Sequence, residues 1–188
     1  LPTLKKAGLH VIEEHEMLTD AQKEYVDQYF EENVYPVLTP MAMDSSRPFP
    51  LIRNKTLNIG ALIAKKDRKK EEKILEFATV QVPSVLPRVV LIPGGKNDKQ
   101  SVIFLEELIE RNIGKLFLNN DVVCAHPYRI MRNADLSIDE DEAEDLLVEI
   151  QKQLKKRQWG EVIRLEVEEK MDSRLLKILK SEFEIKEE

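Results

Sequence analysis

Hydrophobic and polar residues alternate in several short runs of this 188-residue chain, and such alternation predicts β-strands. The run at residues 57–64 is apolar on both faces after Asn58, which indicates a strand in the interior of a sheet. A short polar loop joins residues 89–92 to residues 101–104, so these two segments can pair antiparallel. The predicted strands are residues 57–64, 74–82, 89–92, 101–104, 122–125, 128–132 and 162–167, with His126 and Pro127 between the fifth and the sixth.

Helical spacing of apolar residues marks four further segments. Thr19 and Gln22 form the pattern of a capping box, which predicts a helix over residues 20–33. Carboxylates at the start and basic residues at the end delimit a second helix, residues 139–154, because each sign of charge favours one end of the helix dipole. The two shorter helices carry Leu105, Leu108, Ile109 and Leu116 after Phe104, and Leu175, Leu176, Leu179 and Phe183 after a cap at Asp172 or Ser173.

The connections between these elements are marked by prolines and charges. Four prolines between positions 36 and 50 predict that residues 34–50 form an ordered loop laid over the core. The charge run at residues 65–73 (KKDRKKEEK) is interpreted as a solvated connection between strands.

Strands interleaved with helices favour an α+β fold, in which a layered, mixed β-sheet is covered by helices. A chain of this length with 42% hydrophobic residues can bury one substantial core, so we expect a single domain over residues 1–188. Residues 1–18 are expected to be a boundary segment from a preceding domain. Because the chain opens at Leu1 without an initiator methionine, we also expect it to be a piece of a longer polypeptide.

The charge balance and the cysteine content exclude several classes of protein. A net charge of −6 disfavours a general nucleic-acid binder, because a polyanion would be repelled unless a local basic patch offset the field. The single cysteine, Cys124, allows no internal disulfide and fits a reducing compartment. No run approaches the roughly 20 apolar residues that a bilayer span requires, and the first residues lack the apolar centre of a signal peptide. We therefore predict a cytoplasmic protein with no nucleic-acid partner and no membrane span.

The histidines and glycines provide no recognisable catalytic motif. His126 precedes a proline in a strand connection, and we interpret it as structural rather than as a nucleophile. His10 and His15 lack companions at the spacing of zinc ligands, so we predict no metal site. The sequence also contains no glycine-rich phosphate cradle, which makes a self-sufficient nucleotide site an unfavourable hypothesis.

Five basic residues are candidates for contact with phosphate. Arg129 and Arg132 are three positions apart, so on a regular strand they face opposite sides, and one of them is expected to be structural. An arginine here can form an ion pair with Asp135 or another acid, or it can clamp phosphate, and we prefer the ion pair. The full candidate set is Arg53, Lys55, Arg88, Arg129 and Arg132, and the preference would reverse if the fold brought these side chains together.

Residues 29–58, YFEENVYPVLTPMAMDSSRPFPLIRNKTLN, combine a helix end, several prolines and the start of a buried strand. This segment resembles the middle, or head, domain of polyphosphate kinases, whose members carry a YF pair followed by PVLTP, HPFP and an N-x-x-LN ending. The resemblance continues through FATVQVPSVLPR, AHPYRIMRNADL, the helix at residues 139–154 and RLEVE. Two positions depart from the family: Arg47 precedes Pro48 where histidine is usual, and Met131 stands where threonine is common.

The resemblance implies an activity for the full-length enzyme, namely the reversible transfer of the terminal phosphate of ATP to polyphosphate. ATP and magnesium are implied for that enzyme, whereas this chain is expected to hold no cofactor and no catalytic residue. The family's phosphorylated histidine and its phosphate ligands belong to domains that would follow Glu188, so the isolated chain is expected to be inactive. The head domain of the family takes part in dimer contacts and helps to wall the active-site tunnel. The expected partners are therefore other domains of the same enzyme, a second copy and polyphosphate.

Two other hypotheses stay open. By sequence pattern alone, the chain equally fits a free-standing interaction module, which would dimerise through an exposed apolar or charged strand face. It also fits, less well, an independent polyanion sensor that uses the five basic candidates.

Overall fold

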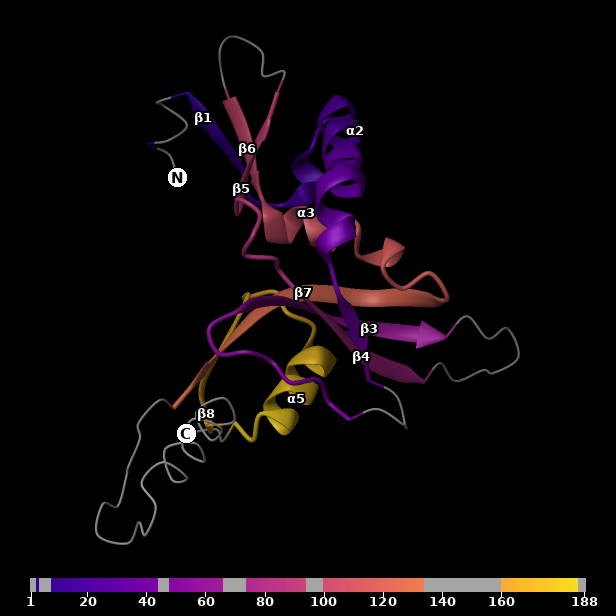
Figure 1. The fold of residues 1–188 in the computed structure, drawn as a ribbon, viewed down its shortest axis with the longest axis vertical. Helices are drawn as coiled ribbons and strands as arrows, with labels where there is room; N and C mark the ends of the chain where they lie inside the picture. The colour runs from indigo at the N-terminus through magenta and orange to yellow at the C-terminus, as the bar shows by residue number, and fades with distance from the viewer. Residues whose placement is uncertain are drawn as a thin grey trace, which may run out of the picture.

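The computed structural model describes residue 3 and residues 8–43, 48–65, 74–93, 100–133 and 160–185 of the chain. This part of the chain forms two lobes, which lie one above the other in Figure 1. The upper lobe contains a three-stranded sheet with helices α2 (Asp20–Tyr29) and α3 (Leu105–Arg111), and the lower lobe contains a five-stranded sheet with helix α5 (Ser173–Glu182). The predicted α+β class is confirmed, although the strands divide between two sheets.

The upper sheet has the strand order β1-β6-β5. Strand β6 (Gln100–Phe104) pairs antiparallel with β5 (Val89–Ile92), as the sequence predicted, and parallel with β1 (Leu9–Ile12). This sheet is therefore mixed. Strand β1 falls within residues 1–18, which the sequence analysis assigned to a boundary segment, and those domain limits stay a prediction.

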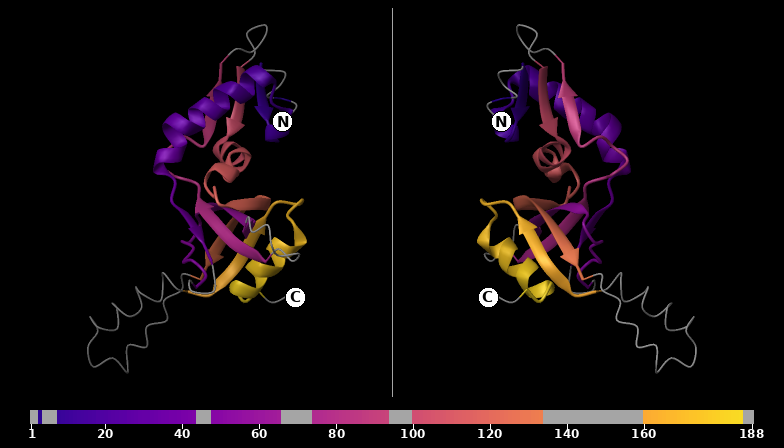
Figure 2. Two further views of the ribbon diagram at one scale, coloured as in Figure 1. Left: turned by 90° about the vertical axis from the view of Figure 1, so that its right-hand side faces the viewer. Right: turned by 90° about the vertical axis from the view of Figure 1, so that its left-hand side faces the viewer.

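The lower sheet has the order β2-β4-β3-β7-β8, and every neighbouring pair in it is antiparallel. Helices α3 and α5 cover its opposite faces, as the two side views in Figure 2 show for α5. The strands are β2 (Pro40–Ala42), β3 (Leu57–Lys65), β4 (Leu75–Gln81), β7 (Asn120–Arg132) and β8 (Val162–Val167).

Strand β3 is the interior strand that its apolar pattern predicted. It lies between β4 and β7, and every residue from position 58 to position 64 is buried. Ile59, Ala61 and Ile63 belong to a hydrophobic cluster that also contains side chains of α2 and α3. Leu62 belongs to a second cluster, which contains Leu175 of α5. The two faces of one strand thus join the core shared by the lobes to the core beneath α5.

The helix starts follow the predicted caps. The hydroxyl of Thr19 accepts a hydrogen bond from the backbone N–H of Gln22 at 3.4 Å, and the Gln22 side chain accepts one from the backbone N–H of Thr19 at 3.1 Å. After Tyr29 the helix continues as one π-helical turn (Phe30–Val34), which matches the predicted end near residue 33. Asp172 caps α5 by accepting from the backbone N–H of Arg174 at 2.9 Å.

Two strand predictions were wrong. Residues 34–50, predicted as a loop, contain the short strand β2, because the chain after the helical turn Tyr35–Val37 lies along the free edge of β4. The two segments at residues 122–125 and 128–132 form one continuous strand, β7, with Pro127 inside it. The carbonyl of Ile130 accepts a hydrogen bond from the N–H of Lys55, so the backbone of Ile130 faces the β3 side. Backbone groups of successive residues in a strand face opposite neighbours, so position 127 faces β8, and the N–H that Pro127 lacks would point there. Strand β8 pairs only with residues 128–132, and the ladder with β3 loses no bond at the proline.

Some predictions fall on residues outside the described part of the chain, namely the helix at residues 139–154, positions 66–73 of the charge run, Arg47 and Asp135. Among the helices that the structure describes, none combines the length and apolar composition needed to cross a bilayer.

Gly60 gives a direct test of how tightly the lower core is packed. A Cβ at this position would lie 3.2 Å from the ring of Tyr128, whose hydroxyl hydrogen-bonds Thr79 at 3.0 Å inside the core. We predict that Gly60→Ala lowers the free energy of unfolding by about 1–3 kcal/mol, because the ring must move and the buried hydrogen bond is strained. Urea denaturation measures the change. Gly114→Ala is the matched control, since nothing lies within 4 Å of its added carbon. Equal effects of the two alanines would contradict the tight packing.

Candidate functional site

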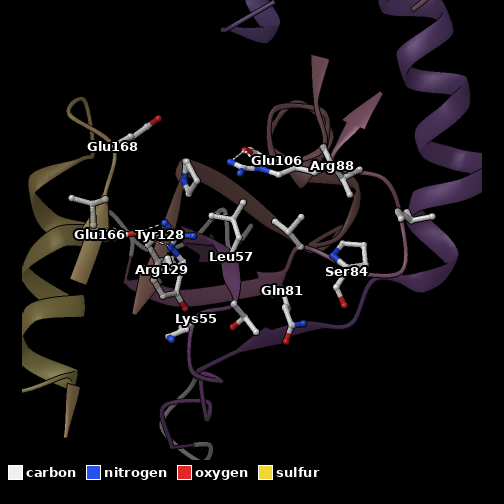
Figure 3. Close-up of a pocket in the computed structure, with 17 residues that line it drawn as sticks. Lys55, Leu57, Gln81, Ser84, Arg88, Glu106, Tyr128, Arg129, Glu166 and Glu168 are labelled. Carbon is white, nitrogen blue, oxygen red and sulfur yellow. Dashed lines mark hydrogen bonds and ion pairs between the residues drawn. The ribbon is translucent and has the colours of Figure 1, made fainter. Parts of the chain in front are cut away.

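A cleft of about 540 Å³ lies where the two lobes meet. Its walls come from the start of α3 in the upper lobe, from the segment between β4 and β5, and from the lower sheet at the start of β3, the end of β4, the inner part of β7 and the end of β8. Figure 3 shows Arg88 and Glu106 at its upper edge, Arg129 and Glu166 on the left, and Lys55 below. Three of the five basic candidates from the sequence therefore line one cleft.

Arg88 is held at the upper edge by a two-pronged ion pair. Its Nη2 donates to Oε1 of Glu106 at 2.5 Å and its Nε donates to the same oxygen at 3.0 Å. The guanidinium also lies over the ring of Phe104, 5.4 Å from the ring centroid. Hydrogen bonding to Glu106 raises the pKa of Arg88, which is a permanent cation in any case. The carboxylate of Glu106 is nearly buried, with 9% of its side chain exposed, whereas 62% of the Arg88 side chain is exposed.

Arg129 is held by the pairing of β7 with β8. It lies opposite Glu166 in the register, and its Nε donates to Oε2 of Glu166 at 2.6 Å. Arg164, two residues before Glu166 on the same face of β8, lies 3.1 Å from the other carboxylate oxygen. Glu166 therefore joins two arginines, and it keeps one of them if the other is removed.

Lys55 reaches the lower edge of the cleft from a strained turn. Its φ of 62° is in the left-handed region, which costs a residue other than glycine roughly 1 kcal/mol. The backbone N–H of Lys55 donates to the carbonyl of Ile130 at 2.9 Å, and this bond fixes the turn to β7. The turn thus holds the lysine beside Arg129.

Arg53 and Arg132 do not line this cleft. Arg132 follows an irregularity in the β7–β8 pairing, and its Nη1 and Nη2 donate to the backbone carbonyls of Gly160 at 2.8 Å and Ile52 at 3.3 Å. Burial lowers the pKa of Arg132. This arginine ties two chain segments together, while Arg53 is exposed on the turn before Lys55.

The charges along the cleft balance. Lys55, Arg88 and Arg129 face three carboxylates, those of Glu106, Glu166 and Glu168, among the residues that line it. An anion that enters the cleft must therefore compete with carboxylates for the two arginines. Each arginine has five N–H donors, however, so it can bind a phosphate oxygen while it remains paired.

A second cleft, of about 360 Å³, contains residues that the sequence analysis did not group. His126 contacts Glu168 through Nδ1, and Glu110 of α3 lies beside them, with one ligand atom of each within 4.8 Å of the others. The expectation that the chain binds no metal stays a prediction. Knowledge that the AHPYR and RLEVE segments pair would have placed His126 near Glu168. The sequence alone does not give this pairing, because a long segment separates the two strands.

The acidic surroundings of Glu110 perturb its titration. Burial raises the pKa of this carboxyl to about 8, and the nearby carboxylates of Glu107, Glu168 and Glu16 act in the same direction. At neutral pH, Glu110 is therefore more stable in its neutral form, and its charged form is favoured only beside a cation.

We predict that Arg88→Ala destabilises the chain by about 1–3 kcal/mol, because it leaves the nearly buried carboxylate of Glu106 without its cation. Arg129→Ala should cost less than about 1 kcal/mol, since Glu166 keeps Arg164. Urea denaturation of both variants measures the difference. The double variant Arg88→Gln/Glu106→Gln is the control and should recover most of the loss. A larger effect of Arg129→Ala would contradict this account of the two ion pairs.

Glu110 also generates a pH dependence. Its pKa is about 8 in the folded chain and near the ordinary glutamate value of 4.5 when unfolded, so folding takes up a proton between these values and stability falls as pH rises. The gain in free energy of unfolding from Glu110→Gln, relative to the parent chain, should therefore increase by roughly 1–3 kcal/mol from about pH 5 to about pH 8. Denaturation at both pH values with a chelator present measures it. Glu24→Gln, on the exposed side of α2, is the control, and parallel pH profiles for Glu110→Gln and the parent chain would contradict the assignment.

Comparison with known proteins places this geometry in a family. Residues 21–188 match the model of the polyphosphate kinase middle domain. A polyphosphate kinase of Lactiplantibacillus plantarum is 48% identical over 171 residues, which are 91% of this chain and 23% of that protein. A polyphosphate kinase of Bacillus anthracis is 42% identical over 189 residues, which cover 100% of this chain and 27% of that protein.

The fold also has a solved counterpart. The crystal structure of a polyphosphate kinase from Porphyromonas gingivalis superposes with a TM-score of 0.73 at 23% identity and covers 99% of this chain and 25% of that one. The chain thus spans about a quarter of the length of the relatives that it matches. By the match over residues 21–188 and by these identities, the chain belongs to the polyphosphate kinase family, of which it is the middle domain.

Proposed function

We propose that this chain is the middle-domain part of an enzyme that reversibly transfers the terminal phosphate of ATP to polyphosphate. The family match and the names of its relatives support this activity for the whole enzyme. In this proposal, other domains of the enzyme bind ATP and magnesium and carry the phosphorylated histidine. The enzyme is cytoplasmic and works as an oligomer, and this chain alone is inactive.

The surroundings of His126 support the part of this proposal in which the chain carries no phosphorylated histidine. Its Nδ1 contacts the carboxylate of Glu168, and Glu107 and Glu110 line the same cleft. A phosphate group approaching this imidazole would meet several carboxylates at close range, and like charges in a partly buried site repel strongly. His126 is therefore poorly placed to accept a phosphoryl group.

The first cleft is the part of the chain that we assign to polyphosphate. Lys55, Arg88 and Arg129 come from three separate segments, and their meeting in one cleft is the observation that carries this assignment. Phosphoryl transfer depends mainly on position and on stabilisation of charge, so a domain that walls a tunnel can raise the rate without a nucleophile. We propose that these three side chains guide the polyphosphate chain along one wall.

An assembly role has its own support on the upper lobe. Val89 and Leu91 on β5 alternate with buried residues and are 50% and 51% exposed. Val102 and Phe104 lie beside them in register on β6, so one face of this small sheet is apolar. Because the chain spans only about a quarter of its relatives, we propose that another domain of the same enzyme packs on this face.

Polyphosphate binding tests the cleft. The chain should bind polyphosphate saturably at low salt and more weakly at moderate salt, because exposed charges are screened. Arg129→Gln and Lys55→Gln should each lower the affinity by roughly three- to tenfold, which corresponds to about 0.7–1.4 kcal/mol. The double variant Arg88→Gln/Glu106→Gln tests Arg88 without leaving a buried charge. Fluorescence anisotropy of a labelled polyphosphate measures all three.

Arg53→Gln and Lys177→Gln are the matched controls, since both residues are exposed and neither lines the cleft. If they weaken binding as much as Arg129→Gln, the interaction is a general charge effect and the cleft assignment is wrong. If the chain binds no polyphosphate, sedimentation on the same sample decides what remains. A dimer would then mark the chain as an assembly element, and a monomer would show that both functions need the other domains.

A further inference from the structure

Three side chains from three elements converge in the second cleft. Glu110 lies on α3 of the upper lobe, His126 lies on β7 of the lower lobe, and Glu168 follows directly after β8. One ligand atom from each lies within 4.8 Å of the other two. Ligand atoms around a tetrahedral zinc ion are about 3.4 Å apart, given metal–ligand distances near 2.1 Å. Donors within 4.8 Å of one another are close enough for one ion to be held among them.

The donor set is mixed, which distinguishes it from an ordinary acidic surface. Zinc binds both imidazole nitrogen and carboxylate oxygen, and three protein donors leave one position of a tetrahedral site open. An imidazole donor also favours a transition metal over magnesium, which prefers oxygen donors and retains its water. None of these three residues comes from the same strand or helix as another, so the group is a product of the fold.

The same cleft lacks the positive charge that its carboxylates require. Among the described residues, seven glutamates and one lysine line the cleft, together with His15 and His126. Glu168 contacts His126, and the ring nitrogens of His15 lie 3.4 Å from Glu107 and 3.3 Å from Glu16, so each histidine, if protonated, pairs with carboxylates other than Glu110. Lys170 at the rim pairs with Glu14 at 2.5 Å. Glu110 is left without a cation from these groups.

His15 lies in the same cleft, and one of its ring nitrogens makes no well-formed hydrogen bond. Its Nδ1 is buried and makes no hydrogen bond within the described part of the chain, although a carboxylate oxygen of Glu107 lies 3.4 Å away. The ring lines the same cleft as Glu110, His126 and Glu168, next to Glu107. At that distance the contact with Glu107 is weak, and a buried nitrogen gains from a better-placed partner. A bound ion with its own water molecules would supply that partner.

We propose that Glu110, His126 and Glu168 bind a divalent transition-metal ion of the Zn²⁺ or Mn²⁺ class, with His15 beside it. The ion links α3 of the upper lobe to β7 and β8 of the lower lobe. Because Arg88 is bonded to Glu106 on α3 and Arg129 lies on β7, the ion also fixes the spacing of the arginines across the first cleft. This proposal is independent of polyphosphate and is an alternative to the sequence-based expectation of no metal, which the zinc titration below decides.

Zinc binding to the untagged chain tests the proposal. Isothermal titration with Zn²⁺ should give one equivalent per chain, and the melting temperature should rise with the logarithm of the free zinc concentration above Kd. His126→Ala, Glu168→Gln and Glu110→Gln should each lower the affinity more than about tenfold, because a lost ligand costs at least as much as a lost second-layer contact. His10→Ala and Glu24→Gln lie outside the cleft and should bind zinc like the parent chain.

A measurement on the unchanged chain covers the case in which a ligand variant fails to fold. Substoichiometric Co²⁺ should broaden the imidazole NMR signals of His126 and His15 and leave that of His10 sharp. Broadening of all three signals alike, or of none, would overturn the proposal. It would also be overturned if the folded ligand variants bound zinc as tightly as His10→Ala, since the ion would then sit on the acidic surface.

Discussion

Everything in this structure depends on the burial of β3 on both faces. Its residues from position 58 to position 64 are buried. The side chains on one face pack in the core shared by the lobes, and those on the other face pack in the core under α5. A strand buried in this way tolerates neither a charge nor a shift of register, because a shift by one residue exchanges its two faces. The positions of β4 and β7, and with them both clefts, follow from this one strand.

The two clefts are linked through α3. This helix begins directly after β6, packs on the lower sheet through Leu108 and Ile109, and carries Glu106 toward one cleft and Glu110 toward the other. Glu168 lines both. The contact between the lobes is therefore apolar at its centre and charged at its two sides. Its apolar part sets the distance between the lobes, while the charged side chains set which ligands can enter.

The sequence predicted what local pattern controls. The capping box at Thr19, the cap at Asp172 and the double-sided apolar run of β3 all depend on neighbouring residues, and all are found in the structure. It did not predict the continuity of β7, because proline usually interrupts a strand and only the tertiary arrangement shows that no partner is lost at Pro127. Nor did it reveal which arginines share a cleft. Arg88 and Arg129 meet through two sheets and a helix, and no spacing along the chain encodes that meeting.

Pro127 illustrates how a missing donor can shape a surface several residues away. The pairing of β8 with β7 ends at Val167, which lies opposite Tyr128. The next backbone hydrogen bond toward β8 would need a donor at position 127, and proline has no N–H. The backbone of β8 is therefore released from the sheet one residue before Glu168, and the chain can turn there toward α5. A glutamate held in the ladder would follow the alternation of the strand, whereas a glutamate just beyond its end is free to swing across to His126. The imino acid thus acts as a terminator of the ladder, and the place where it stops the pairing decides where an acidic side chain becomes available.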